Sequence, residues 1–187
     1  MSCGKLFVIS GASGVGKSTV LKAVMAARPD LRFSVSATTR DPRPGEQDGV
    51  HYYFISRETF REWIEKDAFV EYDFHNNTYY GTPKAQLEDK LSRGSVILDI
   101  EPVGAFNVRR VRPDATLIFI NAPSREELER RLRGRGDTPE EQIRMRLDRA
   151  AWEMEQAARY DYTVINDQAD ACADEIIKII ANVAGEI

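Results

Sequence analysis

The sequence contains little cysteine and no long apolar run. Its two cysteines, Cys3 and Cys172, stand far apart in a chain of 187 residues, so no disulfide framework is indicated and we expect reduced thiols. No run approaches the roughly 18 apolar residues that span a bilayer. The N-terminus shows no features of a secretory signal. We therefore expect a cytoplasmic protein with no membrane partner.

An excess of basic residues is also missing. The chain has 26 Lys and Arg against 30 Asp and Glu, a formal net charge of -4. General nucleic-acid binding needs a positively charged face, so this balance argues against it. Apolar residues make up 42% and charged residues 30% of the sequence, as in an ordinary globular protein with one hydrophobic core.

Short apolar runs alternate with helical patterns along most of the chain. Strands are predicted at Leu6–Ser10, Ser95–Ile100, Thr116–Ile120 and Tyr162–Ile165. Helices are predicted at Lys17–Ala27, Pro83–Ser92, Val103–Val111, Arg125–Arg133, Pro139–Ala158 and Asp170–Val183. This alternation predicts an α/β fold in which helices flank a parallel sheet.

Two segments interrupt the alternation. Residues 33–81 contain a Pro/Gly-rich turn, two aromatic runs and a short helix beginning near Ser56, and we interpret them as a small mixed α/β insertion. Residues 134–138 carry two glycines between arginine-rich helices, a pattern typical of a hinged loop. Within those helices, Arg133, Arg144 and Arg149 are expected to form surface pairs.

Residues 11–18, with the sequence GASGVGKS, match the pattern of a phosphate-binding loop and stand between a predicted strand and a predicted helix. Backbone N–H groups of such a loop and the positive end of the helix bind phosphate. Lys17 is expected to reach the β- and γ-phosphates, and Ser18 to bind Mg²⁺. The alternative is a glycine-rich turn without a ligand.

Asp99 ends an apolar strand and is a candidate carboxylate for holding magnesium through water. A carboxylate that only caps the strand end is the alternative. Arg40 and Arg43 lie in the turn-rich part of the insertion, and their guanidinium groups suit a phosphate dianion. Arginines on loops are also commonly just solvated, so their spacing alone leaves this role open.

From Leu6 to about Ile180 the sequence resembles the guanylate kinases, which convert GMP and ATP to GDP and ADP. The resemblance rests on motifs in the family's order: ISGASGVGKST, FSVSATTRDPRPGE, DGVHYYF, FVEY, YYGTP, ILDI, RLRGRG and VIND. It implies a P-loop parallel sheet with a helical lid, in one domain. The implied parts are a core of residues 1–32, 83–133 and 159–187, a GMP-binding insertion of about 33–82 and a lid of about 134–158.

The resemblance also implies the site residues. Those for the GMP phosphate are Arg40, Arg43, Tyr52 and Tyr80. Those for guanine are Ser36, Glu71, Thr82 and Glu101. Those for ATP are Gly11, Ala12, Ser13, Gly14, Val15, Gly16, Lys17, Ser18, Thr19, Arg131 and Asn166, and Ser18 is also the metal ligand. Those that act on the transferred phosphate are Lys17, Arg40, Asp99, Arg135 and Arg146.

The chemistry of Glu71 agrees with its implied role. We expect an ionised carboxylate with two acceptors, which match the N1–H and 2-amino donors of guanine, whereas adenine has no such pair. One stretch departs from the family, which usually has Asp-Ile-Asp followed by a Gln-Gly pair, whereas this chain has Asp-Ile-Glu-Pro-Val-Gly at residues 99–104, with Glu101 at the second Asp. The base contact of Glu101 is therefore in doubt.

Two other functions fit parts of the sequence. A ribose-phosphate kinase of the same fold would need no base recognition, which Ser36, Glu71 and Thr82 argue against. A non-catalytic guanylate-kinase-like module would lack the phosphate loop, which is intact here. We expect ATP, GMP and dGMP as substrates, Mg²⁺ as cofactor and a role in purine nucleotide metabolism. Monomer and homo-oligomer both stay open.

Overall fold

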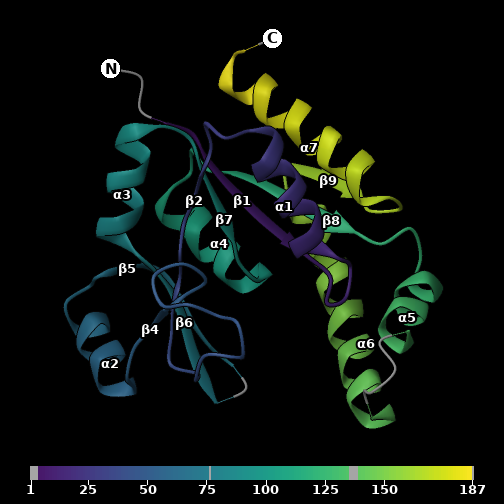
Figure 1. The fold of residues 1–187 in the computed structure, drawn as a ribbon, viewed down its shortest axis with the longest axis horizontal. Coiled ribbons are helices and arrows are strands. Elements are labelled where there is room, and N and C mark those ends of the chain that lie inside the picture. The colour runs from purple at the N-terminus through teal and green to yellow at the C-terminus, as the bar shows by residue number, and fades with distance from the viewer. Residues whose placement is uncertain (1–3, 76, 135–138, 187) are drawn as a thin grey trace. The chain divides into compact units, whose positions relative to one another are not determined.

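The computed structural model describes residues 4–75, 77–134 and 139–186 (Figure 1). The chain divides into two compact units. The first unit comprises the N-terminal residues up to Leu6 and the segment Asp30–Ala115, and the second comprises Phe7–Pro29 and the residues from Thr116 onward. Each unit contains parallel strands and helices, which confirms the predicted α/β class.

The second unit contains parallel strands in the order β1-β8-β9. These strands are β1 (Leu6–Gly11), β8 (Thr116–Asn121) and β9 (Tyr162–Ile165). Every residue of β1 and the four central residues of β8 are buried. Parallel strands covered on both faces read as continuous apolar runs, which is why the sequence shows them clearly.

Four helices belong to the second unit: α1 (Lys17–Ala27), α5 (Arg125–Arg133), α6 (Glu140–Glu155) and α7 (Ala169–Ala184). Helices α1 and α7 pack side by side, as Figure 1 shows, and α5 contacts α6. Ser124 begins α5 because its hydroxyl accepts a hydrogen bond from the Glu127 N–H at 3.1 Å. A 3₁₀ turn, η1 (Gln156–Arg159), continues α6.

The first unit contains a short parallel pair and a separate mixed sheet. The pair is β2 (Arg32–Phe33) and β7 (Val96–Asp99), accompanied by α3 (Lys84–Arg93) and α4 (Pro102–Val111). The mixed sheet has the order β4-β3-β6-β5, from β3 (Ala37–Thr38), β4 (Tyr53–Phe54), β5 (Phe69–His75) and β6 (Thr78–Pro83). Helix α2 (Arg57–Glu65) lies within the same insertion.

A small aromatic core holds the insertion together. The Phe60 ring from α2 stacks on Phe69 of β5 and Tyr79 of β6, with centroids 4.3 and 5.0 Å apart. Ala37 and Trp63 pack in the same cluster. These stacked rings account for the aromatic runs that set this segment apart in the sequence, and they position the two long strands β5 and β6.

The predicted elements are confirmed, with small differences at their ends. Helices α1 and α5 and strand β9 have the predicted bounds, and the helix predicted to reach Ala158 leaves α-helical geometry after Glu155. Strand β2 was not predicted because two residues give no periodicity. In the described part of the chain, no helix has the length and apolar character needed to cross a membrane.

Candidate active site

The predicted phosphate loop, residues 11–18, connects β1 to α1. Gly14 and Gly16 have φ angles of +87° and +91°, a region that side chains with a Cβ rarely adopt. A Cβ on Gly14 would also lie 2.5 Å from Leu132 Cδ2. Both glycines are therefore required by the backbone, and Gly16 directly precedes the first turn of α1.

Two residues implied for ATP binding contact the loop backbone. The Val15 carbonyl accepts hydrogen bonds from Asn166 Nδ2 at 2.7 Å and from Arg131 Nη1 at 3.4 Å. Arg131 also donates to the carbonyls of Asn166 and Asp167, at 2.8 and 3.2 Å, and pairs with Glu127 at 2.7 Å. The structure thus brings Arg131 and Asn166 to the loop and gives both a role in supporting it.

A buried carboxylate that the sequence analysis missed contacts the same loop. Glu153 Oε2 accepts a hydrogen bond from the Ser13 backbone N–H at 2.7 Å. Its Oε1 pairs with Arg149 at 2.9 Å, so the expectation that Arg149 belongs to a surface pair was wrong. A signal was present, because Glu153 continues the buried helical stripe of Ile143, Leu147 and Ala150.

The remaining described site residues of the second unit lie on α1 and α6. Lys17 opens α1 and is half-buried, while Ser18 and Thr19 are exposed at the end of the helix whose free N–H groups attract anions. Arg146 is half-buried on α6. Arg135 lies outside the described residues.

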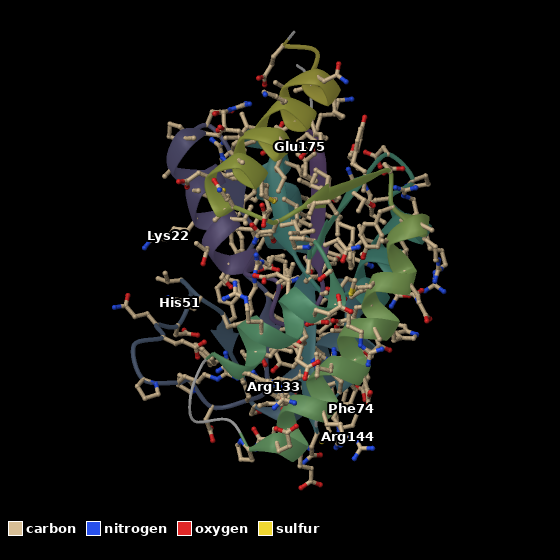
Figure 2. All side chains as sticks on the ribbon, turned by 90° about the vertical axis from the view of Figure 1, so that its right-hand side faces the viewer. Lys22, His51, Phe74, Arg133, Arg144 and Glu175 are labelled. Carbon is tan, nitrogen blue, oxygen red and sulfur yellow. The ribbon has the colours of Figure 1, made fainter. Side chains whose placement is uncertain are left out.

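Arg133 and Arg144 are exposed on α5 and α6, as Figure 2 shows, and this agrees with their expected surface position. Arg133 pairs with Glu129 at 2.8 Å and with Glu140 at 2.5 Å. Ion pairs of this exposed kind contribute little to stability. Neither residue is therefore needed to explain the site.

In the first unit, three residues implied for the GMP phosphate gather around Arg40. Its guanidinium carbon lies 5.0 Å from the Tyr52 ring centroid, and the Tyr52 and Tyr80 rings are 6.1 Å apart. The contact with the face of the Tyr52 ring restricts where the guanidinium plane can lie. Arg43 is exposed, and its backbone N–H donates to Glu46 at 2.8 Å.

Glu46, which the sequence analysis also missed, orients Arg40. Its two carboxylate oxygens accept from Arg40 Nη1 and Nη2, both at 2.6 Å, while Nη1 donates also to the Asp41 carbonyl at 2.9 Å. Hydrogen bonds from Arg40 and from the Arg43 backbone lower the pKa of Glu46 to about 2. A guanidinium has five N–H donors, so the Nε hydrogen and one Nη2 hydrogen are left to meet an anion.

Glu71 and Thr82 face each other on β5 and β6. The Thr82 hydroxyl donates to Glu71 Oε1 at 2.7 Å, and Glu71 is only 7% exposed. The other oxygen, Oε2, lies 2.7 Å from the position that a Cβ of Gly104 would take, so Gly104 of α4 leaves the space for this carboxylate. The carboxylate of Glu71, the predicted guanine acceptor, is therefore held by the Thr82 hydroxyl at one oxygen, and its other oxygen occupies the space that the missing side chain of Gly104 leaves.

The surroundings of Glu71 favour its protonated form more than the sequence analysis expected. Burial raises the pKa of Glu71 to about 7, with a smaller contribution from the charge of Asp73, although the hydrogen bond from Thr82 acts in the opposite direction. Without a ligand, the carboxyl therefore keeps its proton to a higher pH than a solvated glutamate does. Ligand N–H donors favour its ionised form.

The other predicted residues of this unit stand near strand and helix ends. Ser36 is half-buried directly before β3. Asp99 is the last residue of β7, and Glu101 precedes Pro102 at the start of α4. Both acidic side chains are half-buried. The structure places Glu101 directly before α4, the helix that packs against β5, and β5 carries Glu71.

Comparisons with known proteins identify the family of this chain. The guanylate kinase family model matches residues 3–183. The chain is 46% identical to a guanylate kinase of Rubrobacter xylanophilus over 98% of its own length and 96% of the relative's, and 45% identical to one of Fusobacterium nucleatum over 97% and 98%. A crystal structure of guanylate kinase from Anaplasma phagocytophilum superposes with a TM-score of 0.79 at 32% identity, covering 97% of this chain and 87% of that one. The chain belongs to the guanylate kinase family of ATP:GMP phosphotransferases.

Proposed function

We propose that this chain transfers the γ-phosphate of ATP to GMP with the residues described above, each unit supplying the contacts to one nucleotide. The observation that carries the proposal is the buried pair of Glu71 and Thr82. Glu71 is only 7% exposed, and the hydrogen bond described for its carboxylate comes from a neutral hydroxyl and not from a cation. Burying a carboxylate in this way costs stability, so the fold alone gives little reason for it. Such a carboxylate does suit a ligand with two adjacent N–H donors, which guanine has.

On the ATP side, the loop N–H groups and the start of α1 bind the phosphate chain, and Lys17 binds the β- and γ-phosphate oxygens. Phosphoryl transfer requires positioning and charge stabilisation more than covalent chemistry. Arg146 and Arg135 supply positive charge for the transferred group. Asn166 and Arg131 hold the loop in shape through Val15.

Magnesium fits the donor set of this chain. Ser18 offers a hydroxyl oxygen at the start of α1, and a hard oxygen ligand of this kind suits Mg²⁺. The carboxylate of Asp99, at the end of β7, stays a candidate for holding the ion through water. When bound, the ion neutralises negative charge on the phosphate oxygens. We propose Ser18 as its direct protein ligand.

On the GMP side, Arg40 presents its two remaining N–H donors to the phosphate, and Arg43, Tyr52 and Tyr80 add further donors. Glu71, Ser36 and Thr82 contact the guanine. Glu101 keeps the charge of the family's Asp at this position with a longer side chain. Because these contacts reach the phosphate and the base, dGMP should also be a substrate.

The proposed domain roles follow from the same residues. The chain works as one guanylate-kinase-like domain, in which residues of about 33–82 bind GMP and residues of about 134–158 form the lid. A cytoplasmic location and a role in purine nucleotide metabolism stay predictions. The buried and free Cys172 accords with a reducing compartment.

A coupled assay of ADP release tests the function directly. The purified chain receives ATP and Mg²⁺ with GMP, dGMP, AMP, UMP, CMP or ribose 1,5-bisphosphate in separate reactions. We expect rapid ADP release with GMP and dGMP only. Activity with the ribose phosphate would refute base recognition, and no activity with any acceptor would refute the kinase function.

A further inference from the structure

Helix α6 buries an acidic side chain against the phosphate loop. Glu153 is 1% exposed, although glutamate is seldom buried without partners. Its Oε2 accepts from the Ser13 backbone N–H at 2.7 Å, and its Oε1 accepts from Arg149 Nε at 2.9 Å. Each carboxylate oxygen therefore has a donor, and one of these donors belongs to the loop itself.

The loop is held at two places along its length. Glu153 binds it at Ser13, before the first positive-φ glycine, Gly14. Asn166 binds it at Val15, after that glycine. A bond between an ionised carboxylate and a backbone N–H is stronger than one between neutral groups. Loss of the Glu153 contact would leave the first half of the loop without this anchor and the Ser13 N–H unpaired.

Glu153 also shares a helix face with Arg146. The two residues stand seven positions apart on α6, which is close to two full turns of an α-helix. At about 1.5 Å per residue, Arg146 lies roughly 10 Å along the helix axis from Glu153. Because α6 is one continuous helix, a bond that fixes Glu153 to Ser13 also fixes the height of Arg146 relative to the loop.

We propose that Glu153 is a positioning residue for phosphoryl transfer, which fixes the phosphate loop through the Ser13 N–H and keeps Arg146 on α6 in place beside it. The inference rests on the proposed role of the loop in ATP binding. The carboxylate of Glu153 bonds to Ser13 and Arg149, so its effect on phosphoryl transfer is indirect and passes through the position of the phosphate loop and of Arg146.

Two substitutions of similar volume separate this role from simple packing. The side-chain carbonyl of Glu153→Gln can still accept from Ser13, whereas Glu153→Met has no comparable acceptor. The partner that Glu153→Met leaves behind, Arg149, has a side chain 34% exposed and can turn toward water, so we expect the Met variant to fold. The Met variant should lose at least about tenfold in kcat/KM for ATP, with the Gln variant within about threefold of the parent.

The effect should be confined to ATP. We expect Glu153→Met to raise KM for ATP and lower kcat while KM for GMP stays within about twofold of the parent, because the GMP contacts belong to the first unit. Thermal unfolding of each variant reports on its fold. Should Glu153→Met not fold, Glu153→Asp replaces it, since a side chain one methylene shorter keeps the charge but draws the carboxylate away from Ser13.

Matched controls isolate the Ser13 contact. Arg149→Lys keeps a positive charge for Oε1 and leaves the Ser13 bond, so it should retain most ATP activity. Glu155→Gln neutralises an exposed carboxylate two residues further along α6 and should behave as the parent. A folded Glu153→Met variant with the parent's ATP parameters would overturn the proposal, as would equal losses in the Met and Gln variants or a parallel rise in KM for GMP.

Calorimetric binding of ADP with Mg²⁺ keeps this test separate from the proposed function. If the parent released no ADP with GMP, the kinase function would fail, yet Glu153→Met should still bind ADP more weakly than Glu153→Gln does. Equal ADP affinities in those two variants would refute the role of Glu153 in fixing the loop, whatever the activity of the parent.

Discussion

The two units hold their functional groups in different ways. In the first unit, the side chains proposed to contact GMP are paired with other side chains: Glu71 with Thr82, and Arg40 with Glu46. Guanine has the same ring system as adenine and differs from it in its pattern of donors and acceptors, so its recognition requires particular side-chain atoms in particular places. A substitution here should change which acceptor is used.

In the second unit, side chains hold a backbone. Asn166 and Arg131 bind the Val15 carbonyl, and Glu153 binds the Ser13 N–H. Phosphate groups are the same in every nucleoside triphosphate, and loop N–H groups suffice to bind them. A substitution here should lower the rate with every acceptor and leave the preference among acceptors unchanged.

Lys17→Ala should have the largest effect and tests the second unit. The ammonium group acts on the β- and γ-phosphates, so kcat should fall by at least 100-fold, about 2.7 kcal/mol of barrier, while the fold is retained. Steady-state ADP release measures kcat, and thermal unfolding shows whether the fold is retained. Lys22→Ala, an exposed position on the same helix (Figure 2), is the control. Turnover above about a tenth of the parent's would contradict the role of Lys17.

Glu71→Ala tests the first unit. It should lower kcat/KM for GMP by roughly 30- to 1000-fold, or 2 to 4 kcal/mol, and narrow the gap between GMP and AMP. KM for ATP should hardly change. Glu65→Ala, at an exposed carboxylate at the end of α2, is the matched control. Activity with GMP within about threefold of the parent would show that another group reads the guanine.

Much of the fold and part of the candidate site in each unit could be predicted from the sequence. The phosphate loop has a fixed spacing and stands between an apolar strand and a helix, so its position and the bounds of α1 followed directly. The long helices and buried strands have clear periodicity. The role of Glu71 came from a family motif, because no local pattern distinguishes a base-reading glutamate from one that is solvated.

The supporting residues could not be predicted, because their partners are distant in the sequence or depend on exact backbone position. Glu153 meets Ser13 across 140 residues. Gly104 matters only because α4 brings it against Glu71 of β5. Glu46 is close to Arg40 in sequence, yet the chain can turn in many ways between them, so the sequence does not show which acidic residue pairs with Arg40. The raised pKa of Glu71 depends on burial by several elements, which one sequence does not reveal.

The raised pKa of Glu71 gives a pH-dependent prediction for stability. The folded state retains the proton up to about pH 7, whereas the unfolded chain releases it near the ordinary value of 4.5. The folded state thus binds more protons between these values, and the free energy of unfolding should fall as pH rises through this window. Across this window the free energy of unfolding should fall by roughly 3 kcal/mol because of Glu71.

Glu71→Gln should remove that dependence. Relative to the parent, the variant should gain stability as pH increases from about 4.5 to 7, and above pH 7 the difference should stay constant. Urea unfolding of both proteins at a series of pH values measures it. A parent–variant difference that does not change with pH would show that Glu71 has an ordinary pKa in the folded protein.

Gly104→Ala should have the smallest effect and is the most specific test of how the first unit positions its carboxylate. The new Cβ would lie 2.7 Å from Glu71 Oε2 and 3.3 Å from its Cδ, too close for the observed carboxylate position. Because a carboxylate is the end of a flexible side chain, it can move while the helix stays, and alanine favours a helix over glycine by about 1 kcal/mol. We therefore expect a folded variant whose KM for GMP rises about tenfold, or 1.4 kcal/mol, with KM for ATP unchanged.

A double-mutant cycle decides whether this loss arises through Glu71. In a Glu71→Ala background the clash has no carboxylate to displace, so adding Gly104→Ala should change kcat/KM for GMP by less than about twofold. Val103→Ala, at the neighbouring exposed position of α4, controls for general effects on the helix. If the two losses were additive instead, Gly104 would act on GMP independently of Glu71, and the gap in α4 would not be what positions the guanine acceptor.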